Sequence, residues 1–343
     1  MGFRPKRLAA TLAAAGAALL LATGVAGAQP FRLIVTHLEP PLVPNSVMDL
    51  AVDLGYFERE GVDVELVRVQ QTPSAVAALQ ADEGDMANIS VDALLLLVSQ
   101  GVSDMRAVAS PNKSLPFLIA SSDSVGSVQD LTGHSFGVGR IGSLDHSLSS
   151  KVLEAAGVDL NSIEMVGLGQ PAARAQALAA GQVDATTMSI GVWLSLPEKD
   201  GLHVLVDQDA YYETVPVINK VNVVTLKVLQ ERPDDVAAVL RALVKISRDF
   251  AANPSAWAEA MAPYGGDLSP EDLQSLAGTF GASWSVNGGM SRSELQYTQD
   301  WLYATETFAS MAPVTLEQWV DFSVMDGILA DLGTSDGPDP ADR

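Results

Sequence analysis

The sequence predicts an α/β protein built of two lobes. Apolar, β-branched runs alternate with helical runs of about ten to fifteen residues from Phe31 onward, which is typical of parallel sheets covered by helices. A segment at 73–90 is followed by a similar segment at 171–189, which indicates an internal repeat. With 343 residues, the chain is longer than one compact core usually accommodates, so we expect two lobes.

The repeat reads PSAVAALQADEGDMANIS in its first copy and PAARAQALAAGQVDATTMS in its second. In each copy a proline begins an Ala/Leu-rich helix, a glycine ends it, and a short strand leads to a serine, Ser90 or Ser189. Ligands of open α/β sheets bind at the carboxyl ends of such strands. The two serines are therefore expected near a ligand. The alternative is a chance similarity between two Ala-rich helices.

The first 28 residues are predicted to be a signal peptide. Arg4, Lys6 and Arg7 form a positive region, 8–25 is an apolar run, and 26–28 reads A-G-A, a typical cleavage site. We expect cleavage after Ala28. An uncleaved membrane anchor is the alternative, but the Ala richness and the cleavage motif favour export.

The composition excludes several classes of function. The chain has no cysteine, which rules out disulfides, thiolate metal sites, a cysteine nucleophile and a lipid-carrying cysteine. An exported chain without a lipid anchor is expected in the periplasm. Its net charge of −22 disfavours nucleic acid as a partner. The four histidines show no metal-ligand spacing, so neither a metal nor another cofactor is expected.

The order of elements follows from hydrophobic periodicity. Besides the repeat, strands are predicted at 31–36, 62–69, 105–109, 117–120, 135–139, 163–166, 203–206 and 215–224. Helices are predicted at 46–58, 91–100, 190–196, 233–252, 254–262, 270–280, 294–311 and 316–332, and another after the turn 140–146. The aromatic residues of the last helices are expected in the core rather than in a ligand cage. The Gly/Pro/Asp-rich end, 333–343, is predicted to be disordered.

Four motifs in one order carry a family resemblance: LAVDLGYFEREGVDVELV, VQDLTGHSFGV, AGQVDA and ERPDDVAAVLRA. Together they resemble the nitrate/sulfonate/taurine and thiamine-pyrimidine-precursor solute-binding proteins of ABC importers. The resemblance implies a type II periplasmic binding-protein fold, in which two α/β lobes joined by two hinge strands close around a small molecule. The first lobe would comprise 29–118 and 222–332, and the second 119–221. One copy of the repeat would then face the other across the cleft.

The resemblance also implies which loops line the cleft. In the first lobe, the hinge included, the candidate residues are His37, Glu39, Asn45, Ser46, Gln70, Gln71, Thr72, Asn88, Ser90, Asp92 and Asn222. In the second lobe they are Arg140, Ser143, Asp145, His146, Ser189 and Trp193. Ser46 and Ser143 could equally be helix caps, and Asp145 could serve only the helix dipole.

The chemistry of these loops leaves the charge of the ligand open. Arg140 could clamp a carboxylate or a sulfonate through two parallel hydrogen bonds. The loops otherwise offer little positive charge. This favours a neutral, polar heterocycle, or an anion held by neutral donors and helix ends.

Three functions fit the resemblance. The first is a monomeric, non-catalytic receptor that delivers a small molecule to an ABC permease. The second is an enzyme on the same fold, of the pyrimidine-synthase or menaquinone-pathway type. The absence of cysteine opposes the synthase reading, because that type relies on a cysteine-rich motif. The third is a binding module that feeds a membrane sensor.

Overall fold

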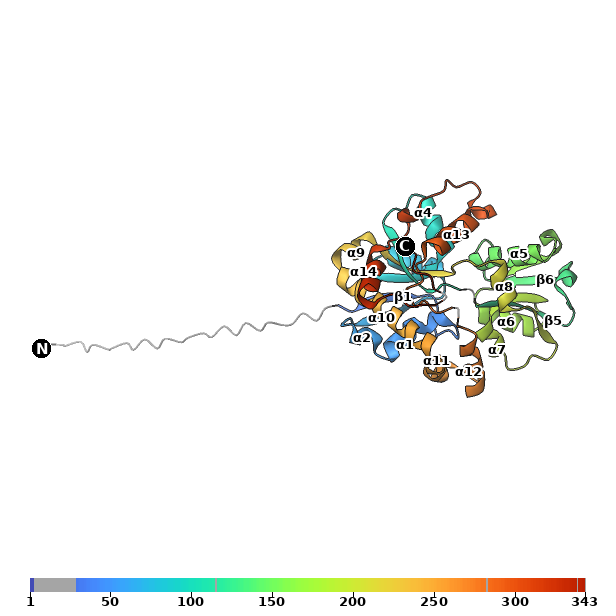
Figure 1. Cartoon of the computed structure of the whole chain (residues 1–343), viewed down its shortest axis with the longest axis horizontal. Helices are drawn as coiled ribbons and strands as arrows, with labels where there is room; N and C mark the ends of the chain where they lie inside the picture. Colours follow the sequence, from blue (N-terminus) through green and yellow to red (C-terminus); the bar gives the residue numbers. More distant parts are fainter. Residues whose placement is uncertain (3–28, 115, 282, 338, 343) are drawn as a thin grey trace.

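The computed structural model describes residues 1–2, 29–114, 116–281, 283–337 and 339–342. Residues 3–28 of the predicted signal peptide lie outside this range, so cleavage after Ala28 stays a prediction. The described elements gather into two bodies, one of which contains α5 to α8 with β5 and β6 (Figure 1). None of the helices within the described range has both the length and the apolar character needed to cross a bilayer.

The first sheet has the strand order β2-β1-β3-β10-β4. β1 is parallel to both β2 and β3, whereas β10 lies antiparallel between β3 and β4. The strands are β1 (Phe31–Val35), β2 (Val64–Arg68), β3 (Met86–Ser90), β4 (Met105–Asn112) and β10 (Lys220–Thr225).

The second sheet repeats this arrangement in the order β7-β6-β8-β5-β9. β6 is parallel to β7 and β8, and β5 lies antiparallel between β8 and β9. The strands are β5 (Phe117–Ser122), β6 (Ser135–Val138), β7 (Glu164–Gly167), β8 (Ala185–Ser189) and β9 (Leu202–Val206). β5 is the first strand after the chain leaves the first sheet for the second, and β10 is the first strand after the chain returns to the first sheet. The predicted two-lobed α/β fold is therefore confirmed, with β5 and β10 as its connecting strands.

Helices cover the sheets. Those of the first lobe are α1 (Val47–Asp53), α2 (Tyr56–Arg59), α3 (Thr72–Gln80), α4 (Val91–Ser99), α9 (Leu226–Glu231), α10 (Pro233–Ala252), α11 (Pro254–Met261), α12 (Pro270–Gly278), α13 (Arg292–Tyr303) and α14 (Ser323–Leu332). Those of the second lobe are α5 (Leu144–Ala155), α6 (Pro171–Ala179), α7 (Ile190–Leu194) and α8 (Gln208–Thr214). Single 3-10 turns lie at Pro44–Ser46, Val128–Leu131, Leu160–Ser162, Ala262–Tyr264, Glu306–Phe308 and Leu316–Gln318.

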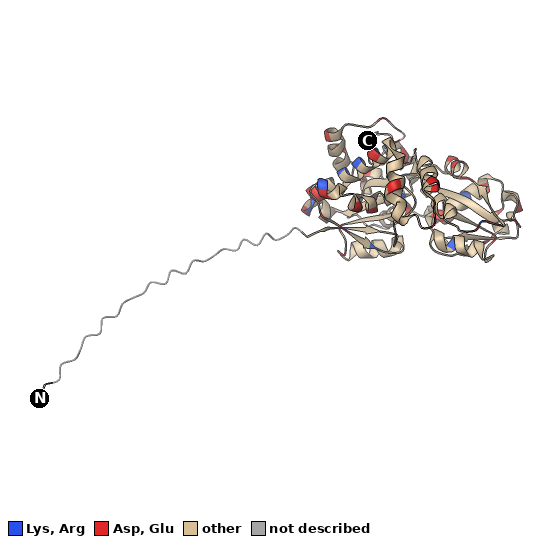
Figure 2. Ribbon diagram, turned by 90° about the horizontal axis from the view of Figure 1, so that it is seen from below, with Lys and Arg blue, Asp and Glu red and all other residues tan. Residues whose placement is uncertain are grey.

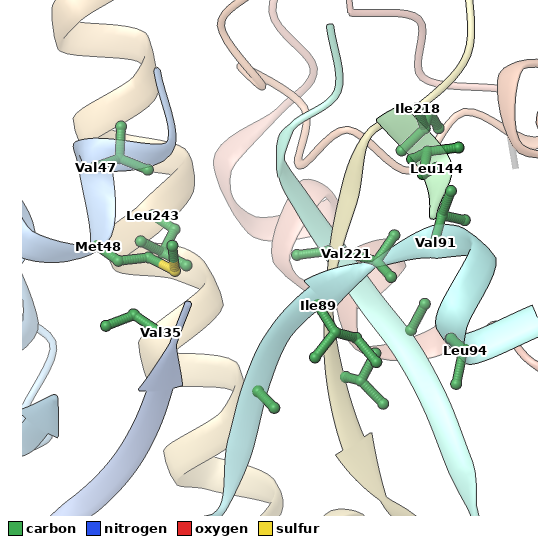
Figure 3. Close-up of a cluster of buried hydrophobic side chains, with 14 of the residues drawn as sticks. Val35, Val47, Met48, Ile89, Val91, Leu94, Leu144, Ile218, Val221 and Leu243 are labelled. Atoms are coloured by element: carbon green, nitrogen blue, oxygen red, sulfur yellow. The ribbon is translucent and has the colours of Figure 1, made fainter. Parts of the chain in front are cut away.

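The main hydrophobic core runs through both lobes. In the first lobe, Val35 and Met48 face Leu243 of α10, while Ile89 and Val221 meet across β3 and β10 (Figure 3). Leu144 of α5 belongs to the same cluster. A smaller cluster fills the space beneath α6 and α7.

Most aromatic residues of the C-terminal helical part lie in the core, as expected, although Tyr297 of α13 is exposed. Trp257, Trp284, Phe308 and Trp319 are buried. The ring of Trp257 lies edge-on to Phe280, with centroids 5.2 Å apart.

Some predicted elements differ from those in the structure. The helix predicted at 294–311 ends at Tyr303, and only the 3-10 turn Glu306–Phe308 follows it. The helix predicted at 316–332 is broken because Val320 forms a bridge with Ala107 of β4. The strand predicted at 215–224 begins only at Lys220, and the unpredicted α8 precedes it.

The C-terminal residues are not a free tail, contrary to prediction. Asp339 is buried, and its carboxylate accepts hydrogen bonds from the backbone N–H groups of Asn287 (2.6 Å) and Gly289 (3.0 Å). Asp342 accepts from Ser291 at 2.5 Å. The Gly/Pro/Asp composition suggested disorder because it does not reveal that these aspartates have backbone donors in a distant loop.

Acidic residues are distributed over both lobes, and basic residues are fewer (Figure 2). This distribution matches the net charge of −22.

Candidate functional site

A cavity of about 460 Å³ lies between the two lobes. It is lined by loops that follow β1, β3, β6, β7 and β8 and by the first residues of β5 and β10. Cavities of this volume suit small molecules. The parallel strands of both sheets thus end at the cavity, as expected for ligand sites of open α/β sheets.

The two copies of the repeat contribute equivalent residues to this cavity. Pro73 and Ser90 line it from the first lobe, and Pro171 and Ser189 line it from the second. In the first copy α3 precedes β3, and in the second α6 precedes β8. Each copy therefore presents the start of its helix and the end of its strand to the same space.

The antiparallel strands bring two further residues to the same edge. Lys220 pairs with Ser90 at the start of β10, and Phe117 pairs with Ser189 at the start of β5. Both Lys220 and Phe117 line the cavity. A strand that runs against its neighbour begins where that neighbour ends, which places these residues beside the terminal serines.

Lys220 supplies a positive charge without a carboxylate partner. Its Nζ donates a hydrogen bond to Thr36 Oγ1 at 2.5 Å, and no described carboxylate lies within ion-pair distance of it. Burial lowers the pKa of Lys220 to about 8, from an ordinary value of 10.5. An anionic group placed beside this ammonium would relieve the cost of burying it.

Asp92 faces the cavity from the first turn of α4. Burial raises the pKa of its carboxyl group, and hydrogen bonds from Ser90 and the Ala93 backbone together with the charge of Arg140 partly oppose that rise. Its Oδ1 atom is buried without a hydrogen-bond partner among the described residues. Asp92 can therefore accept a hydrogen bond from a ligand.

Asp145 and Arg174 form an ion pair at the second-lobe side of the cavity. Arg174 is 2% exposed, and Asp145 also accepts from the Gly139 backbone N–H at 2.7 Å and from the Ser143 hydroxyl. Burial alone would raise the pKa of Asp145, but Arg174 and these hydrogen bonds outweigh it and lower the pKa. The charges of Asp145 and Arg174 neutralise each other, and the hydrogen bonds to Asp145 fix the turn that carries Arg140.

His37 is held by a second buried carboxylate. Its Nε2 lies 2.8 Å from Asp49 Oδ2, and Arg68 donates to the other oxygen of Asp49 at 2.7 Å. This arrangement orients the imidazole at the cavity wall.

Most of the predicted site residues line the cavity. They are His37, Glu39, Asn45, Gln71, Thr72, Ser90, Asp92, Arg140, Ser143, Asp145 and Ser189.

The remaining predicted residues have other partners and do not line it. Ser46 is buried and accepts from the indole Nε1–H of Trp257 at 2.9 Å. Asn88 is buried in a chain of amides, accepting from Asn45 at 3.1 Å and donating to Asn222 at 2.8 Å. Both Asn88 and Asn222 are fully buried in the sheet, each two residues further from the cavity edge than Ser90 and Lys220, which line it.

Three more predicted residues also lie off the cavity lining. The backbone carbonyl of Gln70 accepts from the side-chain amide of Gln170 in the other lobe. His146 Nδ1 accepts from the Gly142 backbone N–H at 3.2 Å. The Trp193 ring contacts the Lys199 ammonium, 5.8 Å from its centroid.

Sequence reasoning missed several lining residues, notably Thr36, Phe117, Gln170, Arg174, Asn219 and Lys220. Phe117 and Lys220 were missed because the prediction assumed parallel strands throughout. If β5 and β10 had been predicted to run antiparallel to their neighbours, their first residues, Phe117 and Lys220, would have been expected at the cavity.

The comparisons with known proteins agree with this architecture. Residues 47–256, more than half of the chain, match the family model described as NMT1/THI5 like. The chain belongs to the NMT1/THI5-like family. No curated protein matches the sequence.

Solved structures of other proteins have the same fold as this member of the NMT1/THI5-like family. One is the ligand-binding component of an ABC-type import system from Staphylococcus aureus, with zinc bound (15% identity, TM-score 0.69, 87% of this chain and 98% of that chain). A second is the periplasmic aliphatic sulphonate-binding protein SsuA from Escherichia coli (14%, 0.64, 86% and 92%). A third is the periplasmic nitrate-binding protein NrtA from Synechocystis PCC 6803 (12%, 0.65, 91% and 91%). The predicted resemblance and the periplasmic binding-protein fold are thus confirmed.

Within the described residues, no three or more His, Cys, Asp and Glu side chains are grouped so that they could hold a metal ion.

Proposed function

We propose that this protein is a solute-binding protein of an ABC importer that captures a small molecule with one negative charge. The observation that carries the proposal is the cavity between the lobes, with the ammonium of Lys220, which has no carboxylate partner among the described residues, in its wall. The receptor would deliver its ligand to the membrane permease as a monomer. Its lobes would be 29–118 with 222–332, and 119–221.

The charges around the cavity support a ligand with a single negative charge. Arg174 is neutralised by Asp145, so among the described lining residues Lys220 and Arg140 are the lysine and arginine without a carboxylate ion pair. Asp92 and Glu39 would repel a second negative charge but can accept hydrogen bonds. A sulfonate, a carboxylate or nitrate meets these requirements. The names of two structural relatives, an aliphatic sulphonate-binding and a nitrate-binding protein, fit this class.

The geometry supports binding rather than catalysis. The Ser189 hydroxyl accepts from the Val192 backbone N–H, and the Ser143 hydroxyl lies beside the Asp145 carboxylate and 2.6 Å from the Arg140 carbonyl. Neither hydroxyl is bonded to a histidine in the described structure, as an activated nucleophile would be.

A Ser–His–Asp arrangement does occur elsewhere in the second lobe. Ser121 Oγ lies 3.2 Å from His203 Nε2, and His203 Nδ1 lies 3.5 Å from Asp123. Ser121 is fully buried and can donate its proton to the Val125 carbonyl at 3.1 Å. No substrate can reach this hydroxyl, so the arrangement does not support hydrolysis.

Export to the periplasm, with cleavage after Ala28, completes the proposal. It is supported by the sequence pattern of residues 1–28 and by relatives that are described as periplasmic.

A thermal-shift screen tests the proposed function. The panel contains ethanesulfonate, MOPS, acetate, benzoate, nitrate, a pyrimidine and a flavin, and each compound is analysed for chemical change afterwards. A ligand at a hundred times its Kd adds about 2.7 kcal/mol of stability, which should raise the Tm by about 5 °C or more. A shift by an anionic compound that is recovered unchanged supports the receptor. Conversion of a compound, or no shift at all, would contradict it.

A further inference from the structure

The two lobes touch through a backbone contact between Gly191 of α7 and Leu42 of the first lobe. A Cβ atom built on Gly191 would lie 2.4 Å from the Leu42 carbonyl oxygen and 2.5 Å from Leu42 Cβ. Both distances are far below van der Waals contact. Of the described glycines, Gly191 is the one whose Cβ would clash in this way with the opposite lobe.

Neither partner in this contact can move aside easily. Leu42 lies in a loop whose φ angles are restricted by Pro40, Pro41 and Pro44. The Val43 backbone N–H donates to the Pro41 carbonyl at 2.8 Å, which tightens the loop further.

On the opposite side, hydrogen bonds also hold α7 in place. The Ile190 backbone N–H donates to the Pro116 carbonyl at 2.9 Å, and the Ser195 hydroxyl donates to the Gly191 carbonyl at 2.7 Å. A methyl group at Gly191 would therefore be relieved most readily by separating the lobes.

Two other contacts also join the lobes in this arrangement, which we call the closed form. The Gln170 side chain of the second lobe donates to the Gln70 carbonyl of the first lobe. Leu144 of α5 lies beside Val91 and Ile218 in the core shared by the lobes (Figure 3).

We infer that the Gly191–Leu42 contact sets how far the lobes close, and through closure the affinity for the ligand. Gly191 itself does not line the cavity, whereas Leu42 and Val192 do. It is a positioning residue that acts through the geometry of the two lobes. The part of the inference that concerns affinity rests on the proposed function, whereas the part that concerns closure does not.

Crosslinking between the lobes tests this inference. The chain has no cysteine, so the double variant Gln70→Cys/Gln170→Cys can be crosslinked selectively with dibromobimane, a short thiol reagent. Both positions are exposed and approach each other across the lobes in the closed form. The crosslinking rate then reports how often the lobes close, even when the closed form is a minor one.

Gly191→Ala in this background should slow crosslinking by about tenfold or more, because overpacking a close contact is costly. Gly327→Ala is the matched control, since it lies in α14 and its Cβ would meet no atom within 4 Å. Crosslinking of Gly191→Ala at the parental rate would overturn the inference. Failure of the Gly191→Ala variant to fold would also overturn the inference, because the added methyl group would then clash within one lobe rather than between the two lobes.

Adding ethanesulfonate, nitrate or acetate separates this inference from the proposed function. If one of them accelerates crosslinking in the parent, Gly191→Ala should weaken its binding by about tenfold or more. Unchanged affinity would refute the link between closure and binding. If neither these three nor MOPS or benzoate accelerates it, the proposed function fails, whereas slow crosslinking of Gly191→Ala would still establish the steric limit on closure.

Discussion

Lys220 lies directly opposite Ser90 in the antiparallel pairing of β10 with β3. Ser90 ends a strand of the parallel part of the sheet, and Lys220 begins the strand that returns from the second lobe. The same pairing recurs between Phe117 and Ser189 in the other sheet. The duplicated topology thus builds the cavity from matching positions, but it places a charge on one side and an aromatic ring on the other.

Replacing Lys220 should weaken the binding of an anionic ligand. Lys220→Met removes the one cavity ammonium without a described carboxylate partner, and a hydrogen bond to a charged group corresponds to about a 10- to 100-fold change in Kd. Titration calorimetry with the strongest compound of the panel measures this change. The control is Lys227→Met. Lys227 is an exposed lysine of α9 that forms an ion pair with Asp82. Equal losses in both variants would refute the role of Lys220.

The binding of a monoanion should weaken as pH rises through about 8. The pKa of Lys220 is lowered to about 8 in the ligand-free protein, so its charge is lost above that pH. The affinity measured from pH 6.5 to 9.5 should therefore fall in the parent and stay nearly constant in Lys220→Met. If the affinity of Lys220→Met still falls over this pH range, the pH dependence arises from another group.

The same pKa has the opposite effect on ligand-free stability. Between about 8 and 10.5 the unfolded chain binds the proton that folded Lys220 has lost. The free energy of unfolding should therefore rise with pH in this window, by on the order of 1–3 kcal/mol. Urea unfolding of the parent and of Lys220→Met isolates this contribution, because the rise should disappear in the variant.

Two serines of the first lobe should respond differently to the same substitution. Ser90→Ala should weaken ligand binding by about 2- to 10-fold with little change in Tm, because Ser90 lines the cavity. Ser46→Ala leaves the buried indole N–H of Trp257 without its acceptor and should lower stability by about 1–3 kcal/mol. Thermal melts and calorimetry on both variants separate the two roles. Reversed effects would show that the cavity is wrongly assigned.

Removing the carboxylate of Asp145 should destabilise the second lobe. Asp145→Ala leaves the buried Arg174 guanidinium uncompensated, which costs about 3–5 kcal/mol. Because its pKa is lowered below 3.8, the stabilisation by charged Asp145 is present above that pH and is lost as pH falls further. Urea unfolding at pH 7 measures the cost. The double variant Asp145→Ala/Arg174→Met should recover part of it, and no recovery would argue against an uncompensated charge as the cause.

The C-terminal segment should contribute to stability. Asp339→Ala removes the acceptor for the backbone N–H groups of Asn287 and Gly289, at a cost of about 1–3 kcal/mol. Asp336→Ala is the control, because this aspartate is exposed in the same segment. Differential scanning calorimetry compares the two Tm values. Equal Tm values would indicate that the segment is not held in solution.

The fold could be predicted from sequence because it depends on local patterns. The repeat around Ser90 and Ser189 and the alternation of strands with helices establish two α/β lobes. The residues in the loops after parallel strands, such as Glu39 and Arg140, were also predicted to lie near the cleft, and they line it.

The remaining features depend on long-range pairing. Lys220 reaches the cavity only because β10 runs against β3, and Asn88 is buried because Asn45 and Asn222 take up its amide. The order of Asp339 depends on donors about fifty residues earlier in the chain. Such partners cannot be identified from periodicity, which reports only neighbours within one element.

Native mass spectrometry tests the central claim most directly. The protein is incubated with an equimolar mixture of the panel, and the mass of the complex identifies the bound compound. We predict one monoanionic molecule per chain, released unchanged on denaturation, with much less complex formed by Lys220→Met. No complex, a complex with only a neutral compound, or an equal amount of complex with Lys220→Met would contradict the account.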